Sequence, residues 1–184
     1  MALGKWKKIS TEVVLTNPWW TYKIDDYYFP NGNKGKYYYA FTYGSVFIVP
    51  VTDNGKILMV NQYRYLNDRF SIEFPGGGIK KGEEPLFSAR KELIEETGFD
   101  GEIEKIGFHN PFNGVTNEIC QVYIARNLKP SNEFIKDDSE EFELGEYTAD
   151  EIEEMILSNE IYDGMSLATW ALVRRKLNLK ASAG

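Results

Sequence analysis

The chain has 184 residues, and its 21 Lys and Arg against 28 Asp and Glu give a formal net charge of −7. Such a surface repels the phosphates of polymeric nucleic acids, so we expect no DNA or RNA partner. With 42% hydrophobic residues, the chain is long enough for one compact domain and a small N-terminal accessory part.

Rare residues and absent segments exclude further classes of protein. The only cysteine, Cys120, rules out an intramolecular disulfide and a cysteine-based zinc site, and the single His109 cannot form a histidine cluster. Cys120 lies in an alternating apolar run that is typical of a buried strand. The N-terminus has no apolar stretch of signal-peptide length, and no run approaches the roughly 20 apolar residues of a membrane span. We therefore expect a soluble, cytoplasmic protein without a membrane partner.

The first 63 residues predict strands joined by turns. Turn signals occur at residues 17–18 and 30–33, and aromatic-rich segments at residues 19–24 and 36–42 are typical of strands. Residues 45–51 and 57–63 predict two more strands. The Asp-Asn-Gly sequence at residues 53–55 predicts a tight turn between them.

The rest of the chain alternates between helical and extended patterns. A loop with three glycines at residues 74–79 precedes a helix that begins at Pro85 and ends near Thr97, with Gly98 as its C-cap. Strands are predicted at residues 102–108 and 118–125, a polar acidic loop at 130–143, and helices at about 149–159 and 165–178. The last helix has an apolar stripe that we expect to face the core: Leu167, Trp170, Ala171, Val173 and Leu177. This order of elements predicts an α+β fold, a mixed sheet with helices on its faces.

Three glutamates crowd one face of the helix predicted at residues 85–97. Glu92, Glu95 and Glu96 have i, i+3 and i+4 spacing, and such like charges destabilise a helix unless a cation lies between them. The other stripe can face the core and consists of Leu86, Ala89, Leu93 and Thr97. One interpretation is a solvated acidic face that Arg90 and Lys91 neutralise. The other is an oxygen-rich cation site, completed by carbonyl groups of the glycine loop, which suits Mg²⁺ or Mn²⁺.

This segment resembles the Nudix box, Gly-x5-Glu-x7-Arg-Glu-φ-x-Glu-Glu-x-Gly-φ, in which φ is apolar. The positions that match are Gly77, Glu83, Glu92, Leu93, Glu95, Glu96, Gly98 and Phe99. One position departs from the pattern, because Lys91 stands where the box has arginine and therefore lacks bidentate geometry. The resemblance implies a Nudix-type α/β/α sandwich.

The resemblance also implies roles for individual residues. Glu92 and Glu96 would bind metal together with the carbonyl oxygen of Gly76. Glu95 would be an additional ligand with a part in catalysis, and Glu83 would hold the loop or a water molecule. Two or three Mg²⁺ ions, or Mn²⁺ in their place, would bridge the pyrophosphate oxygens of the substrate. Bound cations would let an acidic protein bind an acidic substrate.

Other segments resemble the ADP-ribose pyrophosphatases and related nucleotide-sugar hydrolases, so the similarity covers nearly the whole chain. Residues 73–77 resemble the segment before the box in this subgroup, which makes Glu73 a substrate-binding candidate. Residues 60–65 resemble a strand whose arginine contacts the substrate diphosphate. That match selects Arg64, which on local grounds is equally consistent with a surface arginine.

Residues 1–43 resemble the N-terminal β extension of this subgroup, and residues 44–184 would then form the catalytic domain. In the subgroup's homodimers the extension helps to build the nucleobase pocket across the interface. Trp19, with Trp20 and Tyr22, is a candidate for stacking a base, and core or interface packing is the alternative.

Two further loops complete the site that the resemblance implies. One contains a glycine, and the other is acidic. Residues 111–118 replace a substrate-binding loop of the subgroup, and Gly114 and Glu118 fit its spacing. Asn113 stands where a proline is diagnostic of ADP-ribose specificity. Other nucleotide sugars therefore stay candidate substrates. The subgroup's catalytic base comes from an acidic loop after the box, and alignment selects Glu140, with Glu141 next. A merely solvated loop is the alternative.

These observations predict a homodimeric, Mg²⁺-dependent enzyme that hydrolyses the pyrophosphate bond of a small nucleoside diphosphate derivative. ADP-ribose, cleaved to AMP and ribose 5-phosphate, or a related nucleotide sugar is the first candidate substrate. A GDP-sugar or dinucleotide pyrophosphatase is an alternative within the superfamily. A non-catalytic nucleotide-sugar sensor is an alternative of another class. Because every glutamate of the box is present, the sequence favours the enzyme.

Overall fold

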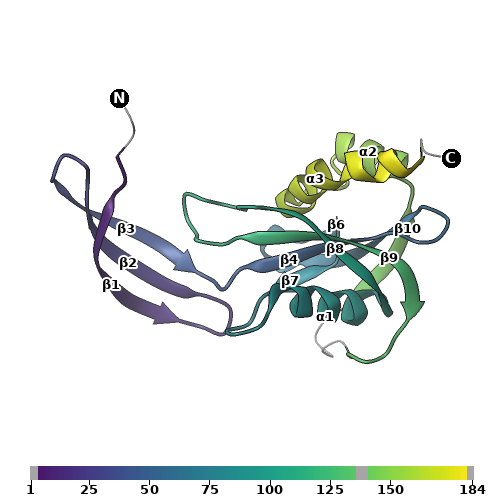
Figure 1. Cartoon of the computed structure of the whole chain (residues 1–184), viewed down its shortest axis with the longest axis horizontal. Coiled ribbons are helices and arrows are strands. Elements are labelled where there is room, and N and C mark those ends of the chain that lie inside the picture. The colour runs from purple at the N-terminus through teal and green to yellow at the C-terminus, as the bar shows by residue number, and fades with distance from the viewer. Residues whose placement is uncertain (1–3, 136–140, 182–184) are drawn as a thin grey trace.

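The computed structural model describes residues 4–135 and 141–181. A three-stranded sheet stands at one end of the molecule, beside a larger body in which helices cover two further sheets (Figure 1). The α+β class predicted from the sequence is confirmed. None of the helices that the structure describes is long and apolar enough to cross a lipid bilayer.

The N-terminal sheet is antiparallel and has the strand order β1-β2-β3. Its strands are β1 (Lys7–Thr16), β2 (Thr21–Tyr28) and β3 (Lys34–Phe41). The predicted turn at residues 17–18 is confirmed, because Asn17 Oδ1 accepts hydrogen bonds from the N–H groups of Trp19 (2.9 Å) and Trp20 (2.8 Å). In the second turn, Gly32 takes a positive φ of 86°. Every residue of β1 is exposed, which leaves this sheet without a covering layer on that strand.

The central sheet has the order β7-β4-β9-β8. It consists of β4 (Ser45–Pro50), β7 (Gly76–Gly78), β8 (Phe99–His109) and β9 (Cys120–Pro130). All six residues of β4 are buried, since this strand lies between β7, which is antiparallel to it, and β9, which is parallel. Strands β8 and β9 extend beyond the predicted ranges because they pair with each other from Phe99↔Pro130 to His109↔Cys120.

The third sheet has the order β10-β5-β6 and contains β5 (Ile57–Arg64), β6 (Arg69–Glu73) and β10 (Phe142–Tyr147). A 3₁₀ turn, η1 (Tyr65–Asn67), joins β5 to β6. The turn at residues 53–55 forms as predicted, with Gly55 at a φ of 81°. Strands β4 and β5 nevertheless separate into different sheets after one bridge, Val51↔Ile57, because each finds its own partners.

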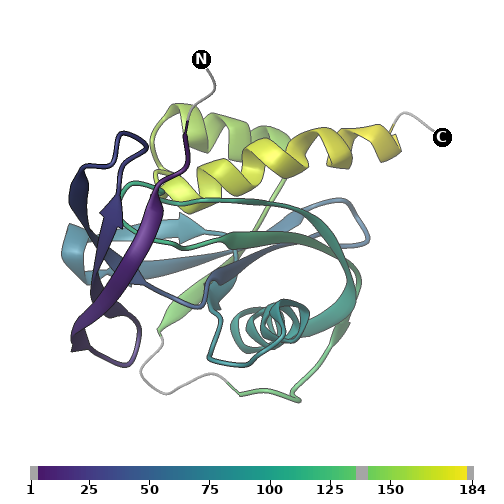
Figure 2. The same ribbon diagram turned by 60° about the vertical axis from the view of Figure 1, so that its left-hand side comes forward.

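Helices cover the sheets from two sides, as Figures 1 and 2 both show. The helix α1 (Pro85–Thr97) lies on one side, and α2 (Ala149–Leu157) and α3 (Gly164–Ala181) lie together on the other. The core under α2 and α3 includes Phe47, Met59, Phe74, Trp170 and Val173. The core under α1 includes Val46, Ile48, Ala89, Leu93 and Tyr123. Strand β4, which contributes to both cores, is therefore covered on both faces.

Four sequence predictions about these elements are wrong. Leu86 is 53% exposed and Ala171 is also exposed, although the other residues of each predicted stripe are buried or pack against the core. Ile94, outside the predicted stripe of α1, is buried. Residues 142–143, the end of the predicted acidic loop, belong instead to β10, which pairs with β5. Residues 76–78, also placed in a loop, form β7 along β4.

The two leucines of α1 provide a test of this packing. Leu93 is completely buried, so Leu93→Ala should lower the free energy of unfolding by about 2–5 kcal/mol. Leu86→Ala, the matched control on the exposed face, should change it by about 0.5 kcal/mol or less. Urea unfolding of both variants measures the difference. Equal losses in the two variants would contradict the described orientation of α1.

Candidate active site

The box helix α1 has well-defined ends. Pro85 occupies its first turn, where a missing N–H costs nothing, and Gly98 ends it in the left-handed region with a φ of 72°. The N–H of Gly98 donates to the carbonyl of Ile94 at 2.9 Å. Because the buried Ala89 and Leu93 fix the rotation of α1 against the central sheet, the positions of its glutamates are fixed as well.

Two of these glutamates lie against the glycine strand β7. The N–H of Gly76 donates to Glu96 Oε2 at 3.0 Å. A Cβ atom built on Gly77 would lie 2.6 Å from Glu92 Oε1, which is closer than a real side chain allows. A Cβ atom built on the neighbouring Gly76 would contact the backbone carbonyl of Val46 on β4. The glycines are therefore needed both for the strand pairing and for the approach of the carboxylates.

Glu83 closes the loop that leads from β7 to α1. Its Oε2 accepts a hydrogen bond from Ser88 Oγ at 3.0 Å and one from the N–H of Lys80 at 3.4 Å. These bonds tie the loop to the first turn of the helix. The geometry is that of a residue that holds the loop, one of the two roles implied for it.

The two cations of α1 have different partners. Lys91 Nζ lies 2.8 Å from Glu95 Oε2, one turn away. Burial alone lowers the pKa of Lys91, but the hydrogen bond to Glu95 and the charge of Glu92 outweigh it and raise the pKa. Arg90 instead binds Asp100 (2.7 Å) on β8 and Glu133 (2.6 Å) after β9. Arg90 therefore joins α1 to the sheet, contrary to the interpretation in which it neutralises the acidic face.

The donor atoms at this corner suit a hard divalent cation. The carboxylates of Glu92 and Glu96 meet a stretch of backbone without side chains, and all the donors are oxygen. Within the described residues, no three Asp, Glu, His or Cys side chains already surround one point. Glu95 is held by Lys91 and Glu96 by the N–H of Gly76. A cation would thus compete with these partners, and the ligand roles of Glu92, Glu95, Glu96 and Gly76 stay predictions.

Arg64 and Glu73 form a paired unit at the end of β5. Arg64 Nε donates to Glu73 Oε1 at 2.7 Å, and its Nη2 donates to Glu73 Oε2, so the pair is bidentate. Glu73 is 2% exposed, whereas the side chain of Arg64 is 45% exposed. The hydrogen bonds that Arg64 donates to Glu73 raise the pKa of Arg64, and the charges of Asp163 and Glu96 add to this effect. Glu73 therefore orients the guanidinium and is too buried to meet a ligand directly.

Of the two residues predicted as the catalytic base, only Glu141 lies in the part of the chain that the structure describes. Glu140 falls outside the described residues. Glu141 is exposed and directly precedes β10, whose first residue, Phe142, pairs with Gln62. Since Arg64 lies two residues further along β5, Glu141 is at the same end of this sheet as Arg64.

Residues 110–119 form a loop that is bonded to the N-terminal sheet. The side chain of Asn117 accepts from the N–H of Thr42 (2.9 Å) and donates to its carbonyl (3.0 Å), as a neighbouring strand would. Tyr37 Oη donates to the carbonyl of Gly114 at 3.0 Å. At the base of the loop, Asn110 Nδ2 donates to the carbonyl of Glu118 at 2.9 Å. The loop that carries Gly114 and Glu118 is therefore held in one shape by β3.

Trp19 lies in the turn between β1 and β2 and is 80% exposed. Trp20 is 40% exposed. Packing of Trp19 in the core of its own chain is therefore wrong, which leaves stacking on a ligand or contact with a partner.

Comparisons with known proteins agree with this site. A family model described as the NUDIX domain matches residues 42–164, which is more than half of the chain. The chain belongs to the Nudix family. It is a Nudix pyrophosphohydrolase, as the sequence predicts, and the match includes the whole box.

Individual relatives of this Nudix protein cover most of its length. It is 33% identical over 177 residues to the ADP-ribose pyrophosphatase of Bacillus subtilis (strain 168), covering 95% of this chain and 96% of the relative. It is 34% identical over 163 residues to the methanol dehydrogenase activator of Bacillus methanolicus, covering 88% of each. A crystal structure described as an ADP compounds hydrolase matches with a TM-score of 0.84 over 98% of both chains. At 21% identity, that similarity shows the fold alone.

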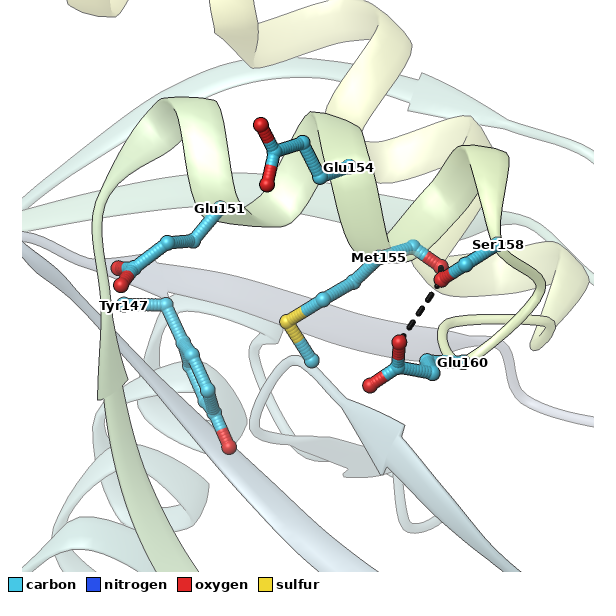
Figure 3. Close-up of a pocket in the computed structure, with 6 residues that line it drawn as sticks. All are labelled: Tyr147, Glu151, Glu154, Met155, Ser158 and Glu160. Atoms are coloured by element: carbon cyan, nitrogen blue, oxygen red, sulfur yellow. Dashed lines mark hydrogen bonds between the residues drawn. The ribbon is translucent and has the colours of Figure 1, made fainter.

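A separate pocket of about 370 Å³ lies beside α2, away from the Nudix box (Figure 3). Tyr147, which lines it, pairs with Ile57 at the opposite end of β5 from Arg64. The other lining residues are Glu151, Glu154, Met155, Ser158 and Glu160. Since its described lining contains three glutamates and no Lys or Arg, this pocket is not suited to an anionic substrate.

Cys120 has no reactive role in this Nudix protein. It is completely buried, and burial raises the pKa of its thiol to about 12. The prediction that it is a small buried hydrophobic residue is confirmed.

Sequence reasoning missed two polar residues that shape the site. Asn117 binds β3 across 75 residues of sequence, and no local pattern indicates that contact. Asp163 caps α3 by accepting a hydrogen bond from the N–H of Ser166 at 2.7 Å, and its charge acts on Arg64. An Asp three residues before the first buried position of a helix is a cap signal that could have been read.

The contact between Asn117 and β3 can be tested by hydrogen exchange. Asn117→Ala removes the acceptor of the Thr42 N–H, and one net hydrogen bond is worth about 1 kcal/mol, so that amide should exchange about five- to tenfold faster. Asn113→Ala, in the exposed part of the same loop, is the control and should leave this rate unchanged. Residue-resolved exchange followed by NMR measures both. An unaltered Thr42 rate in the Asn117 variant would show that the contact does not hold the loop.

Proposed function

We propose that this protein hydrolyses the pyrophosphate bond of a nucleotide sugar with the help of Mg²⁺ or Mn²⁺, and that ADP-ribose is its first candidate substrate. The observation that carries the proposal is the approach of Glu92 and Glu96 to the bare backbone of β7. Carboxylates are oxygen ligands that these cations prefer, and a backbone carbonyl of β7 would add another. Arg64, in residues 60–65, supplies a cation for the diphosphate, and Glu73, in residues 73–77, holds it in place.

The proposed roles of the residues follow from their places. Glu92, Glu96 and the carbonyl of Gly76 would hold the metal, and Glu95 would join them if it leaves Lys91. When bound, the metal neutralises charge on the pyrophosphate and lowers the pKa of the attacking water. Two to three metal ions would bind at this site.

Arg64 would bind the diphosphate with the exposed part of its guanidinium. Glu73 accepts from Nε and from one N–H of Nη2, which leaves the two N–H groups of Nη1 and the other N–H of Nη2 as donors for a substrate. The bidentate pair holds the arginine in one orientation, so little side-chain freedom is lost when the substrate binds.

The proton of the attacking water needs a carboxylate acceptor near the metal. Glu141 directly precedes β10, at the end of the sheet that also bears Arg64, and Glu140 is its neighbour in the sequence. We propose one of these two residues as the general base.

The substrate class is supported by the relatives and limited by one residue. Two relatives, from Bacillus subtilis and Mycobacterium tuberculosis, are ADP-ribose pyrophosphatases, at 33% and 28% identity. Asn113 in the loop of residues 110–119 replaces the proline expected for ADP-ribose. A GDP-sugar or a dinucleotide is therefore the alternative substrate.

We also propose that residues 1–43 form an extension that pairs two copies of the chain, with residues 44–184 as the catalytic domain. The fully exposed β1 carries apolar side chains that water would otherwise surround, among them Val13 at 59% and Leu15 at 55% exposure. The exposed Trp19 would then reach the nucleobase pocket across the interface.

A substrate panel with Mg²⁺ tests the activity. ADP-ribose should give AMP and ribose 5-phosphate, and Glu96→Gln should lower kcat at least about 100-fold, the upper end of what losing an outer partner of a metal site costs. Glu104→Gln, at an exposed position on β8, is the matched control. Product chromatography for ADP-ribose, GDP-mannose, diadenosine polyphosphates and NADH identifies the substrate. If no compound is cleaved with Mg²⁺ or Mn²⁺, the sensor alternative replaces the enzyme.

The dimer has its own test by sedimentation. The wild-type chain should sediment with twice the mass of one chain, and Val13→Asp should shift it to the monomer because it places charges in the proposed interface. Leu157→Asp makes the same change on α2, at 82% exposure, and should leave the mass unchanged. A wild-type monomer at working concentration would refute the proposed pairing.

A further inference from the structure

The first turn of α3 is bonded to the segment that leads into the glycine strand. Ser166 is completely buried, and its Oγ accepts a hydrogen bond from the N–H of Phe74 at 3.2 Å, across 92 residues of sequence. Phe74 is 2% exposed and lies two residues before Gly76. This bond therefore connects the helix layer of α2 and α3 with the strand that faces α1.

Because of Pro75, this bond is the nearest one before Gly76 in which the backbone of the segment is the donor. Because Pro75 has no N–H, the N–H of Phe74 is the closest backbone donor before Gly76. The carbonyl of Pro75 accepts from the N–H of Ile48 at 2.9 Å, and the N–H of Gly76 donates to Glu96 at 3.0 Å. Contacts from α3, β4 and α1 thus fix three successive residues.

Ser166 is itself held in place. Asp163 Oδ2 accepts from its N–H at 2.7 Å, as the cap of α3. One turn later, the indole of Trp170 stacks on the ring of Phe74, with centroids 6.2 Å apart and planes at 20°. Trp170 Nε1 donates in turn to Glu153 on α2 at 2.8 Å. The acceptor that meets the Phe74 N–H is therefore rigid.

We propose that Ser166 is a positioning residue for the divalent cation: its hydroxyl fixes residues 74–76, so that the carbonyl of Gly76 and the carboxylate of Glu96 keep the spacing that binding requires. This inference rests on the proposed function. Without the hydroxyl, a buried N–H has no acceptor, and the segment relieves that cost by moving or by admitting water. Either change displaces Gly76, and the site binds the cation less tightly.

Thr169 offers a matched comparison on the same helix. It is as completely buried as Ser166 and lies less than one turn further along α3. Its Oγ1 has no hydrogen-bond partner within the part of the chain that the structure describes. Thr169→Val removes a buried hydroxyl of α3 without disconnecting the glycine strand, whereas Ser166→Ala disconnects it.

The direct measurement is the binding of Mn²⁺ to the full chain without substrate. Electron paramagnetic resonance detects this binding as a loss of the free-ion signal. Ser166→Ala should raise the Kd for Mn²⁺ about tenfold, the lower end of the effect known for outer partners of metal sites. Thr169→Val should stay within about twofold of the wild type. Thermal unfolding of each variant is recorded beside the titration, and Ser166→Cys, which keeps the volume with a weaker acceptor, should give an intermediate Kd.

Turnover assays separate this inference from the proposed function. In Ser166→Ala, the Mg²⁺ concentration for half-maximal rate should rise by the same factor as the Kd, while kcat at saturating Mg²⁺ changes less. Suppose that the wild type binds Mn²⁺ and cleaves substrate. If Ser166→Ala and Thr169→Val then both bind Mn²⁺ as the wild type does, or both bind it equally more weakly, Ser166 has no positioning role and the proposed function stands. If the wild type neither binds Mn²⁺ nor cleaves any nucleotide sugar, the proposed function fails and this inference falls with it. If Ser166→Ala does not fold, an unchanged Kd in Ser166→Cys overturns the inference.

Discussion

Between Gly77 and Glu92 there is no room for a Cβ atom, since one built there would lie 2.6 Å from Glu92 Oε1. A Cβ at Gly77 would therefore displace the Glu92 carboxylate. One on Gly76, whose N–H donates to Glu96, would meet the backbone carbonyl of Val46. The same glycines pair with β4, so the strand register and the site geometry are set together. The remaining contacts of the site serve to keep α1 and β7 at this distance.

Charge pairing assigns different tasks to neighbouring residues. Arg90 and Lys91 are adjacent in the sequence, yet Arg90 joins α1 to β8 through Asp100 and Lys91 stays on the helix with Glu95. Arg64 is aimed by the buried Glu73 and also feels the charge of Asp163. A chain with a net charge of −7 thus places a bidentately held cation where an anionic substrate is expected.

The N-terminal sheet supports the body at a second place. Its strand β3 binds the loop of residues 110–119 through Asn117 and Tyr37, so the sheet shapes a loop that belongs to the Nudix body. Exposed aromatic and aliphatic side chains on the same sheet leave it incompletely covered in a single chain. The shape of that loop therefore depends on one small sheet.

The sequence by itself determined the family, the box helix and its ends, because these depend on spacing within one helical turn and on Pro85 and Gly98. It also determined which residues share a face of each helix. It did not determine how far each covered face extends: Leu86 and Ala171 are exposed, although the other residues of each predicted stripe are buried or pack against the core. Only the tertiary structure decided that Gly76–Gly78 is a strand, that residues 142–147 pair with β5, and that Ser166 meets Phe74. Each of these contacts joins residues far apart in the chain, where no local periodicity or propensity carries information about the partner.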